Sequence, residues 1–169
     1  MSEYLHENWP PPDDERLAKT VKVLEAIPGG LELLDWFQGQ PCFHDAEVLH
    51  LDLNRRAAAL SISVPGHPDS AAPLKDLVVT FSFKQGDMID LSLEGFSHQN
   101  VMGDMWMRFA EAASVDRSLV GVGLSQGDIE FEIEPCYGAF GKLRATVEKI
   151  TIRPVADYQR ADDLSSTIA

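Results

Sequence analysis

The strongest constraint on the fold is a change in the spacing of apolar residues after Pro41. Before Pro41, Leu17, Val21 and Leu24 recur at the spacing of one helix face. After it, apolar and polar residues alternate in short runs separated by turn-forming residues, which is typical of strands. The connections are too short for the crossover helices of a parallel sheet. The pattern therefore predicts an α+β domain, with N-terminal helices packed on a curved, mostly antiparallel β-sheet.

Two helices are expected before Pro41. The first begins at Asp13 or Asp14, whose carboxylate can cap the first turn, and Pro28-Gly29-Gly30 interrupts it. A second, shorter helix is expected over residues 31–38. The residues of this helix expected to face inward are Leu31, Leu34 and Phe37.

The expected strands follow one another closely. Residues 48–53 and 58–64 form a candidate hairpin, and residues 77–83 are expected to turn back into residues 89–93. In residues 143–152 the parity of the apolar positions shifts, which predicts a β-bulge near Glu148 and Lys149. Further strands are expected at residues 101–109, 119–124 and 128–134.

Length and composition place limits on the class of protein. The chain of 169 residues is within the usual range for one domain, expected over residues 13–155, with flexible segments at 1–12 and 156–169. No apolar run reaches the roughly 18 residues of a membrane span. The start of the chain lacks the basic and apolar regions of a secretory signal, so a cytoplasmic location is expected. The only cysteines, Cys42 and Cys136, are expected to be reduced thiols.

The charge of the chain indicates which partners it can attract. A formal net charge of −13 repels phosphate backbones and anionic lipids, so nucleic-acid and membrane partners are not expected. The same charge favours association with a basic protein, and it also promotes solubility.

One sequence motif matches a catalytic pattern. The segment Gly123-Leu124-Ser125-Gln126-Gly127 has the form of the nucleophile elbow of serine hydrolases. That elbow must lead from a strand into a helix, whereas residues 128–134 alternate like a strand. A hairpin turn is therefore the preferred interpretation, and no catalytic residue is expected.

The residues His44, Asp45, Glu47, His50 and Asp52 are of types that bind metals. On an extended strand of about 3.3 Å per residue, the two histidines would be roughly 20 Å apart, so they could not share one ion. His50 and Asp52 share a face, but solvent-facing residues of a half-exposed strand explain them equally well. No metal or cofactor is expected.

Two strands carry candidates for partner binding. One has carboxylates at every second position, which places them in a row that needs either solvent or a cation-rich partner. The other has large apolar groups on both faces, which suits either a central strand covered on both sides or an adaptable contact surface rich in methionine. The candidates are Asp128, Glu130, Glu132 and Glu134 in the first strand, and Met102 and Trp106 in the second.

The segment from Trp36 to Leu53 contains Pro41-Cys42-Phe43-His44-Asp45-Ala46-Glu47 and then an alternating strand. It resembles the start of the immunity protein 50 family of bacterial polymorphic toxin systems, and looser similarity extends over residues 31–152. The resemblance implies a non-catalytic protein that binds and neutralises a cognate toxin domain, such as a nuclease. It also implies that the motif residues Trp36, Phe43, His44, Asp45 and Glu47 have a mainly structural role. Within this interpretation, Trp36 and Phe43 are expected to be buried where the helix packs on the sheet, and His44 and Asp45 to fix the turn by side-chain hydrogen bonds to the backbone.

Two alternatives stay open at this point. A small-ligand-binding protein or an enzyme would gather His44, Asp45 and Glu47 in a deep pocket beside His98 or Tyr137. An adaptor or homodimer would assemble through the strand that contains Trp106.

Overall fold

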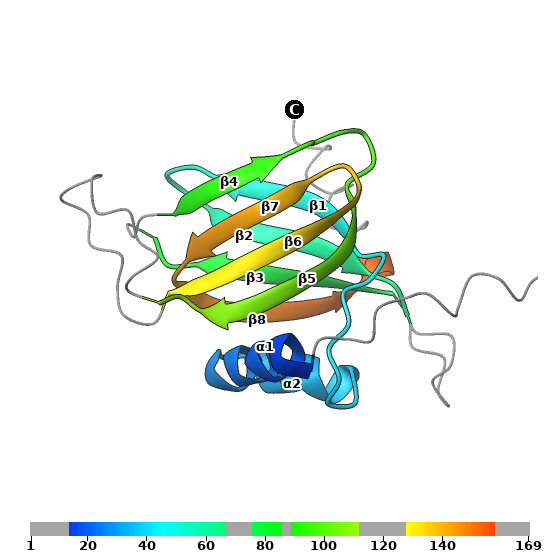
Figure 1. The fold of residues 1–169 in the computed structure, drawn as a ribbon, viewed down its shortest axis with the longest axis vertical. Coiled ribbons are helices and arrows are strands. Elements are labelled where there is room, and N and C mark those ends of the chain that lie inside the picture. The colour runs from blue at the N-terminus through cyan, green and yellow to red at the C-terminus, as the bar shows by residue number, and fades with distance from the viewer. Residues whose placement is uncertain (1–13, 67–75, 86–88, 112–127, 158–169) are drawn as a thin grey trace, which may run out of the picture.

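The computed structural model describes residues 14–66, 76–85, 89–111 and 128–157, which form one eight-stranded sheet and two helices. Every pairing in the sheet is antiparallel, and the strand order is β4-β7-β6-β5-β1-β2-β3-β8 (Figure 1). The sheet is not closed, and the predicted α+β class is confirmed. The elements are α1 (Asp14–Ala26), α2 (Gly30–Trp36), β1 (Glu47–Leu53), β2 (Ala58–Val64), β3 (Leu77–Phe83), β4 (Asp90–Glu94), β5 (Val101–Phe109), β6 (Ile129–Tyr137), β7 (Phe140–Ala145) and β8 (Val147–Pro154).

The sheet curls so that a front half (β4, β7, β6 and β5) faces a rear half (β1, β2, β3 and β8), as Figure 1 shows. The halves join through a ladder between β1 and β5 that contains the pair Glu47 and Val101. Phe131 of β6 meets Phe81 and Phe83 of β3 edge to face, with ring centroids 5.1 and 6.1 Å apart. The core therefore lies between the two halves.

The helices cover the side of the molecule where β5 and β8 lie (Figure 1). The Thr20 hydroxyl of α1 accepts a hydrogen bond from the Met107 N–H at 3.1 Å and lies 3.3 Å from the Met107 carbonyl oxygen, to which it can donate. The Ile150 N–H of β8 donates to the Pro28 carbonyl at 2.8 Å. Residues of α1 and of the connection between the helices thus form hydrogen bonds with backbone groups of both strands, as buried polar groups require.

The predicted break between the helices is confirmed. Gly29 has a left-handed φ of 85°, and an added Cβ there would collide with the Ile150 carbonyl oxygen, so glycine is required. The expected inward position of Leu31 is wrong, because its side chain is 65% exposed. The helix begins at Gly30 and buries Leu33 and Leu34, and at 3.6 residues per turn this turns Leu31 outward.

The predicted hairpin of β1 and β2 is confirmed. The Asn54 side-chain oxygen accepts hydrogen bonds from the N–H groups of Arg56 and Ala57 at 2.8 and 3.0 Å, which fixes the turn. The alternation expected for β1 is only partly right. The register shifts between Val48 and His50, so Val48 is buried while Leu53 at the end of the strand is exposed.

The expected return of residues 77–83 into residues 89–93 is wrong. In the structure β3 pairs with β2 and β8, whereas β4 pairs with β7 in the front half. Consecutive strands β3 and β4 therefore lie in different halves of the sheet. Alternation identified both strands correctly but carries no information about which strand is the neighbour.

The predicted bulge in residues 143–152 is confirmed, because Ser82 pairs with Lys149 and Phe83 with Val147, which leaves Glu148 as the extra residue. The run is nevertheless two strands. The chain changes from β7 in the front half to β8 in the rear half at Thr146. Outside the described residues lie the expected strand 119–124, the segment 1–12 and the tail from residue 158.

Candidate functional site

The motif residues lie in and beside a tight turn between α2 and β1. Phe43 is fully buried, and its ring packs edge to face on Phe37 at a centroid distance of 5.2 Å. The Ala46 N–H donates to the Phe43 carbonyl at 3.0 Å, and Asp45 adopts a left-handed φ of 61°. The burial expected for Phe43 is confirmed. Trp36 is half-buried and packs on Phe37 at 4.8 Å.

Strand β5 holds this turn in place. His44 Nδ1 lies 2.5 Å from the Gly103 carbonyl oxygen, to which it donates. Asp104 Oδ1 accepts from the Phe43 N–H at 3.2 Å and from the Met105 N–H at 2.8 Å. The expected contacts of His44 with the backbone are therefore present. Asp104 was missed from the sequence, although a single carboxylate inside a methionine-rich strand was a visible signal.

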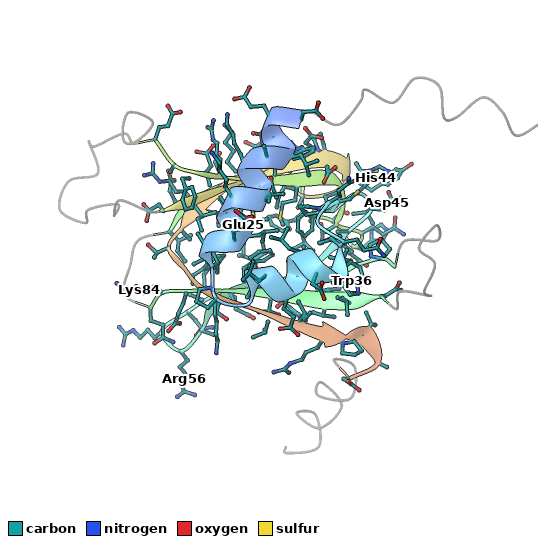
Figure 2. The ribbon with its side chains drawn as sticks, turned by 90° about the horizontal axis from the view of Figure 1, so that it is seen from below. Glu25, Trp36, His44, Asp45, Arg56 and Lys84 are labelled. Carbon is teal, nitrogen blue, oxygen red and sulfur yellow. The ribbon has the colours of Figure 1, made fainter. Side chains whose placement is uncertain are left out.

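The electrostatics of this turn do not favour a thiol nucleophile. Although Cys42 is an exposed residue, desolvation of its thiol raises the pKa, and the nearby carboxylates of Asp104 and Asp45 raise it further. A reactive thiol needs a lowered pKa. His44 Nε2 faces the Asp45 carboxylate at 3.6 Å. Figure 2 shows His44 and Asp45 close together, at the end of the molecule away from Arg56 and Lys84.

The variant Asp104→Asn tests how much the negative charge of the partly buried Asp104 carboxylate lowers the stability of the protein. Burial raises the pKa of Asp104, and repulsion from Glu134 adds to the effect, although hydrogen bonds from Met105 and Phe43 oppose it. A raised folded-state pKa means that the contribution of Asp104 to stability is complete below its unfolded pKa of about 3.9 and is lost as the pH rises. The amide keeps the acceptor oxygen without the charge. We therefore expect urea unfolding to show a variant more stable than wild type at pH 7.

The difference between Asp104→Asn and wild type should disappear near pH 3. A variant less stable than wild type at pH 7 would show that the hydrogen bonds to the charged carboxylate outweigh its desolvation. Asp45→Asn is the matched control, because that side chain is mostly exposed.

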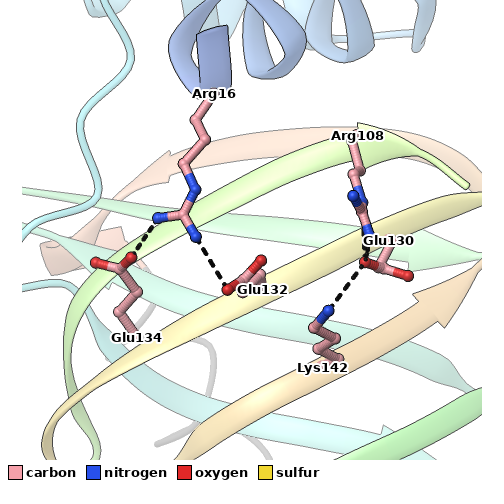
Figure 3. Close-up of polar contacts among 6 residues, drawn as sticks. All are labelled: Arg16, Arg108, Glu130, Glu132, Glu134 and Lys142. Atoms are coloured by element: carbon pink, nitrogen blue, oxygen red, sulfur yellow. Dashed lines mark hydrogen bonds and ion pairs between the residues drawn. The ribbon is translucent and has the colours of Figure 1, made fainter. Parts of the chain in front are cut away.

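The row of carboxylates on β6 is paired within the protein, as Figure 3 shows for three of its members. Arg16 of α1 bridges Glu134 at 2.5 Å and Glu132 at 3.1 Å. Glu130 accepts from Arg108 at 2.6 Å and lies 3.6 Å from Lys142. Asp128 Oδ2 is 3.4 Å from Arg144 Nε, and its other oxygen accepts from the Thr146 hydroxyl at 2.9 Å.

This arrangement changes which candidate residues can meet a partner. Met102, Asp128 and Glu130 are buried, which removes them from the expected contact surface. Trp106 is half-buried beneath the Arg16 guanidinium, which lies 5.6 Å from its ring centroid. A partner role for Glu132, Glu134 and Trp106 stays a prediction.

A hollow of about 200 Å³ lies between α1 and the strands β5 and β6. Trp106 lines it, and the indole Nε1 is buried without a hydrogen-bond partner among the described residues. The other lining side chains mix both signs of charge, which gives no preference for an ion of one sign. The motif residues His44, Asp45 and Glu47 line neither this hollow nor the smaller one beside it.

Metal sites, membrane-spanning helices and free thiols were the other features considered from the sequence. Among them no three His, Cys, Asp or Glu side chains are grouped so that they could hold a metal ion, and no helix is both long and apolar enough for a membrane span. Cys42 and Cys136 are free and exposed. The segment 123–127 lies outside the described residues.

Three aromatic residues are exposed at one corner of the front half, which we call the aromatic corner. Phe96 is 51% exposed, Tyr137 68% and Phe140 38%. Two glycines with positive φ bring the turns that carry these residues together, since a Cβ on Gly95 would touch both the Phe140 ring and the Gly138 carbonyl. Sequence reasoning missed this surface, although aromatic residues beside turn glycines gave a signal.

The loop that carries Phe96 is held by its own hydrogen bonds. The Asn100 side-chain oxygen accepts from the Ser97 N–H at 2.9 Å, and its amide donates to the Ser97 carbonyl at 3.0 Å. Because the backbone of this loop is already ordered, binding through Phe96 would cost little loop-ordering entropy.

Compared with known proteins, the chain matches no family model, no curated protein and no solved structure.

Proposed function

We propose that this protein is a non-catalytic immunity protein, which binds and neutralises a cognate bacterial toxin domain. The observation that carries the proposal is the aromatic corner of Phe96, Tyr137 and Phe140. Exposed apolar patches of this kind are typical of interaction sites, and aromatic residues are enriched in protein interfaces. The resemblance of the Phe43 to Glu47 motif to immunity proteins gives the class of partner.

The charge of the chain supports a basic partner. With a net charge of −13, the protein attracts positively charged surfaces over several ångströms and speeds their association. A toxin that acts on nucleic acid would offer such a surface. The paired carboxylates on β6 contribute less to this attraction than their number suggests, because Arg16, Arg108 and Lys142 neutralise them in part.

The test is co-expression with a candidate toxin domain from a neighbouring reading frame, together with measured binding kinetics. We expect Tyr137→Ala and Phe96→Ala to weaken binding by about 10-fold or more each, as buried aromatic anchors do, and to reduce protection. Phe109→Ala is the matched control. That residue is 44% exposed but lies at the opposite end of β5 from Val101, which pairs with Tyr137.

Unchanged affinity and full protection by both corner variants would exclude the aromatic corner as the binding surface. A toxin that wild-type protein neither binds nor neutralises would contradict the proposed function itself. Salt provides a further check, since a basic partner should associate more slowly as ionic strength rises.

The alternative function is a small-ligand-binding or enzymatic site at His44, Asp45 and Glu47. The observation in its favour is Asp104, a partly buried carboxylate next to His44. Against it, the ring of His44 is held by the Gly103 carbonyl, and the pKa of the neighbouring Cys42 thiol is raised. In the same co-expression assay, loss of protection in the corner variants with full protection by His44→Ala would favour the immunity function.

A further inference from the structure

We propose that the open edge of β4 binds an extended segment of a partner protein as an added strand, and that this segment alternates apolar and basic side chains. The proposal deepens the proposed function and rests on it for the identity of the partner.

Strand β4 is the exposed end of the sheet. It pairs with β7 on one side and is the first strand in the order, with no described strand on its other side. Four of its five residues are exposed, and Leu93 is half-buried. The other terminal strand, β8, differs because Ile150 donates to Pro28 and α2 lies against it. Unpaired edges of this kind can take up an additional strand.

The direction of the backbone groups on β4 can be read from Gly141 of β7. A Cβ built on Gly141 would collide with the Ser92 carbonyl oxygen, so that carbonyl points towards β7. Backbone groups of successive residues in a strand point to opposite sides. The N–H and C=O groups of Leu91 and Leu93 therefore point to the open edge, where a partner strand would bond to them.

The side chains of β4 determine which sequence fits. Leu91 pairs with the fully buried Leu143 and so lies on the inner face, yet it is 41% exposed. Apolar residues opposite Leu91 and Leu93 would cover that surface. Asp90 and Glu94 lie on the outer face and form no ion pair with another described residue, unlike the carboxylates of β6. Basic residues opposite them would complete the pairing.

A second copy of this chain fits the edge poorly. Antiparallel pairing of β4 with its own copy about Ser92 would place Asp90 opposite Glu94 twice, and like charges directly opposite are destabilising. The net charge of −13 opposes self-association further. The charge pattern thus favours a basic segment from a different protein.

The probe is a capped peptide with the core Lys-Val-Thr-Val-Lys, titrated into the full-length protein. We expect binding to slow hydrogen exchange at the amides of Leu91 and Leu93, whereas a peptide with Glu in place of both Lys should bind at least 10-fold more weakly. Leu91→Pro removes an outward N–H without breaking the bonds to β7, so it should abolish binding. Leu91→Ala keeps that N–H and should weaken binding less.

The charge-reversed variant Asp90→Lys with Glu94→Lys gives a second test that needs no proline. It should prefer the Glu peptide to the Lys peptide. Binding of the Lys peptide to Leu91→Pro as tightly as to wild type, with the variant folded, would overturn the proposal. A homodimer that forms through β4, detected by sedimentation and abolished by Leu91→Pro, would overturn it as well.

The toxin assay separates this proposal from the proposed function. If Leu91→Pro still binds and neutralises the toxin domain while Tyr137→Ala does not, the added strand is wrong and the immunity function stands. If wild type binds the Lys peptide but fails to neutralise the toxin domain, the immunity function is wrong and the added strand stands.

Discussion

Phe43→Ala is expected to lower the free energy of unfolding by about 3–5 kcal/mol, the usual cost of removing a large aromatic side chain from a core. Phe43 is fully buried, and its ring contacts Phe37. Its N–H also donates to Asp104, so a shift of the turn to fill the cavity would strain that bond. Urea unfolding followed by far-UV circular dichroism measures the loss.

Leu31→Ala is the matched control for this prediction. Leu31 belongs to the same helix-to-sheet region but is 65% exposed, so its truncation should change stability by about 0.5 kcal/mol or less. If Phe43→Ala cost no more than this control, the ring would not be packing the helices against the sheet.

Asp128→Ala is expected to cost about 3 kcal/mol, towards the lower end of the range for breaking a buried ion pair. The side chains of Asp128 and Arg144 are 2% and 8% exposed, so the loss of the carboxylate leaves a buried guanidinium with one anion fewer. The Thr146 hydroxyl loses its acceptor at the same time. We expect a value at the lower end of this range because Arg144 keeps its other interactions in the variant. Denaturant unfolding gives the value.

The double variant Asp128→Ala with Arg144→Met separates the cost of the lone charge from the cost of lost packing. Removing both charges should recover part of the stability, since apolar replacement of a buried pair is often close to neutral. Glu94→Ala, on the exposed strand β4, should have little effect. A double variant less stable than Asp128→Ala would indicate that the Arg144 side chain stabilises the fold independently of Asp128.

The candidate site was only partly predictable. The burial of Phe43 followed from its place between a helix and a strand, and the alternation on β6 correctly placed its carboxylates in a row. Their ion pairs within the protein were not predictable, because the basic residues that neutralise them come from α1, β5 and β7 and meet β6 only after folding. The aromatic corner was missed for the same reason, since two turns far apart in sequence create it.

The sequence by itself determined the helical start, the break at Gly29, the hairpin of β1 and β2, and the bulge at Glu148, because each depends on the conformational preferences of neighbouring residues. Only the tertiary structure decided that β4 pairs with β7 rather than β3, and that Thr146 divides one apolar run between two halves of the sheet. Strand pairing depends on burial between segments distant in sequence, and an alternating pattern satisfies many partners equally well. The open edge of β4, on which the proposed strand addition depends, follows from the pairing of β4 with β7 alone among the described strands.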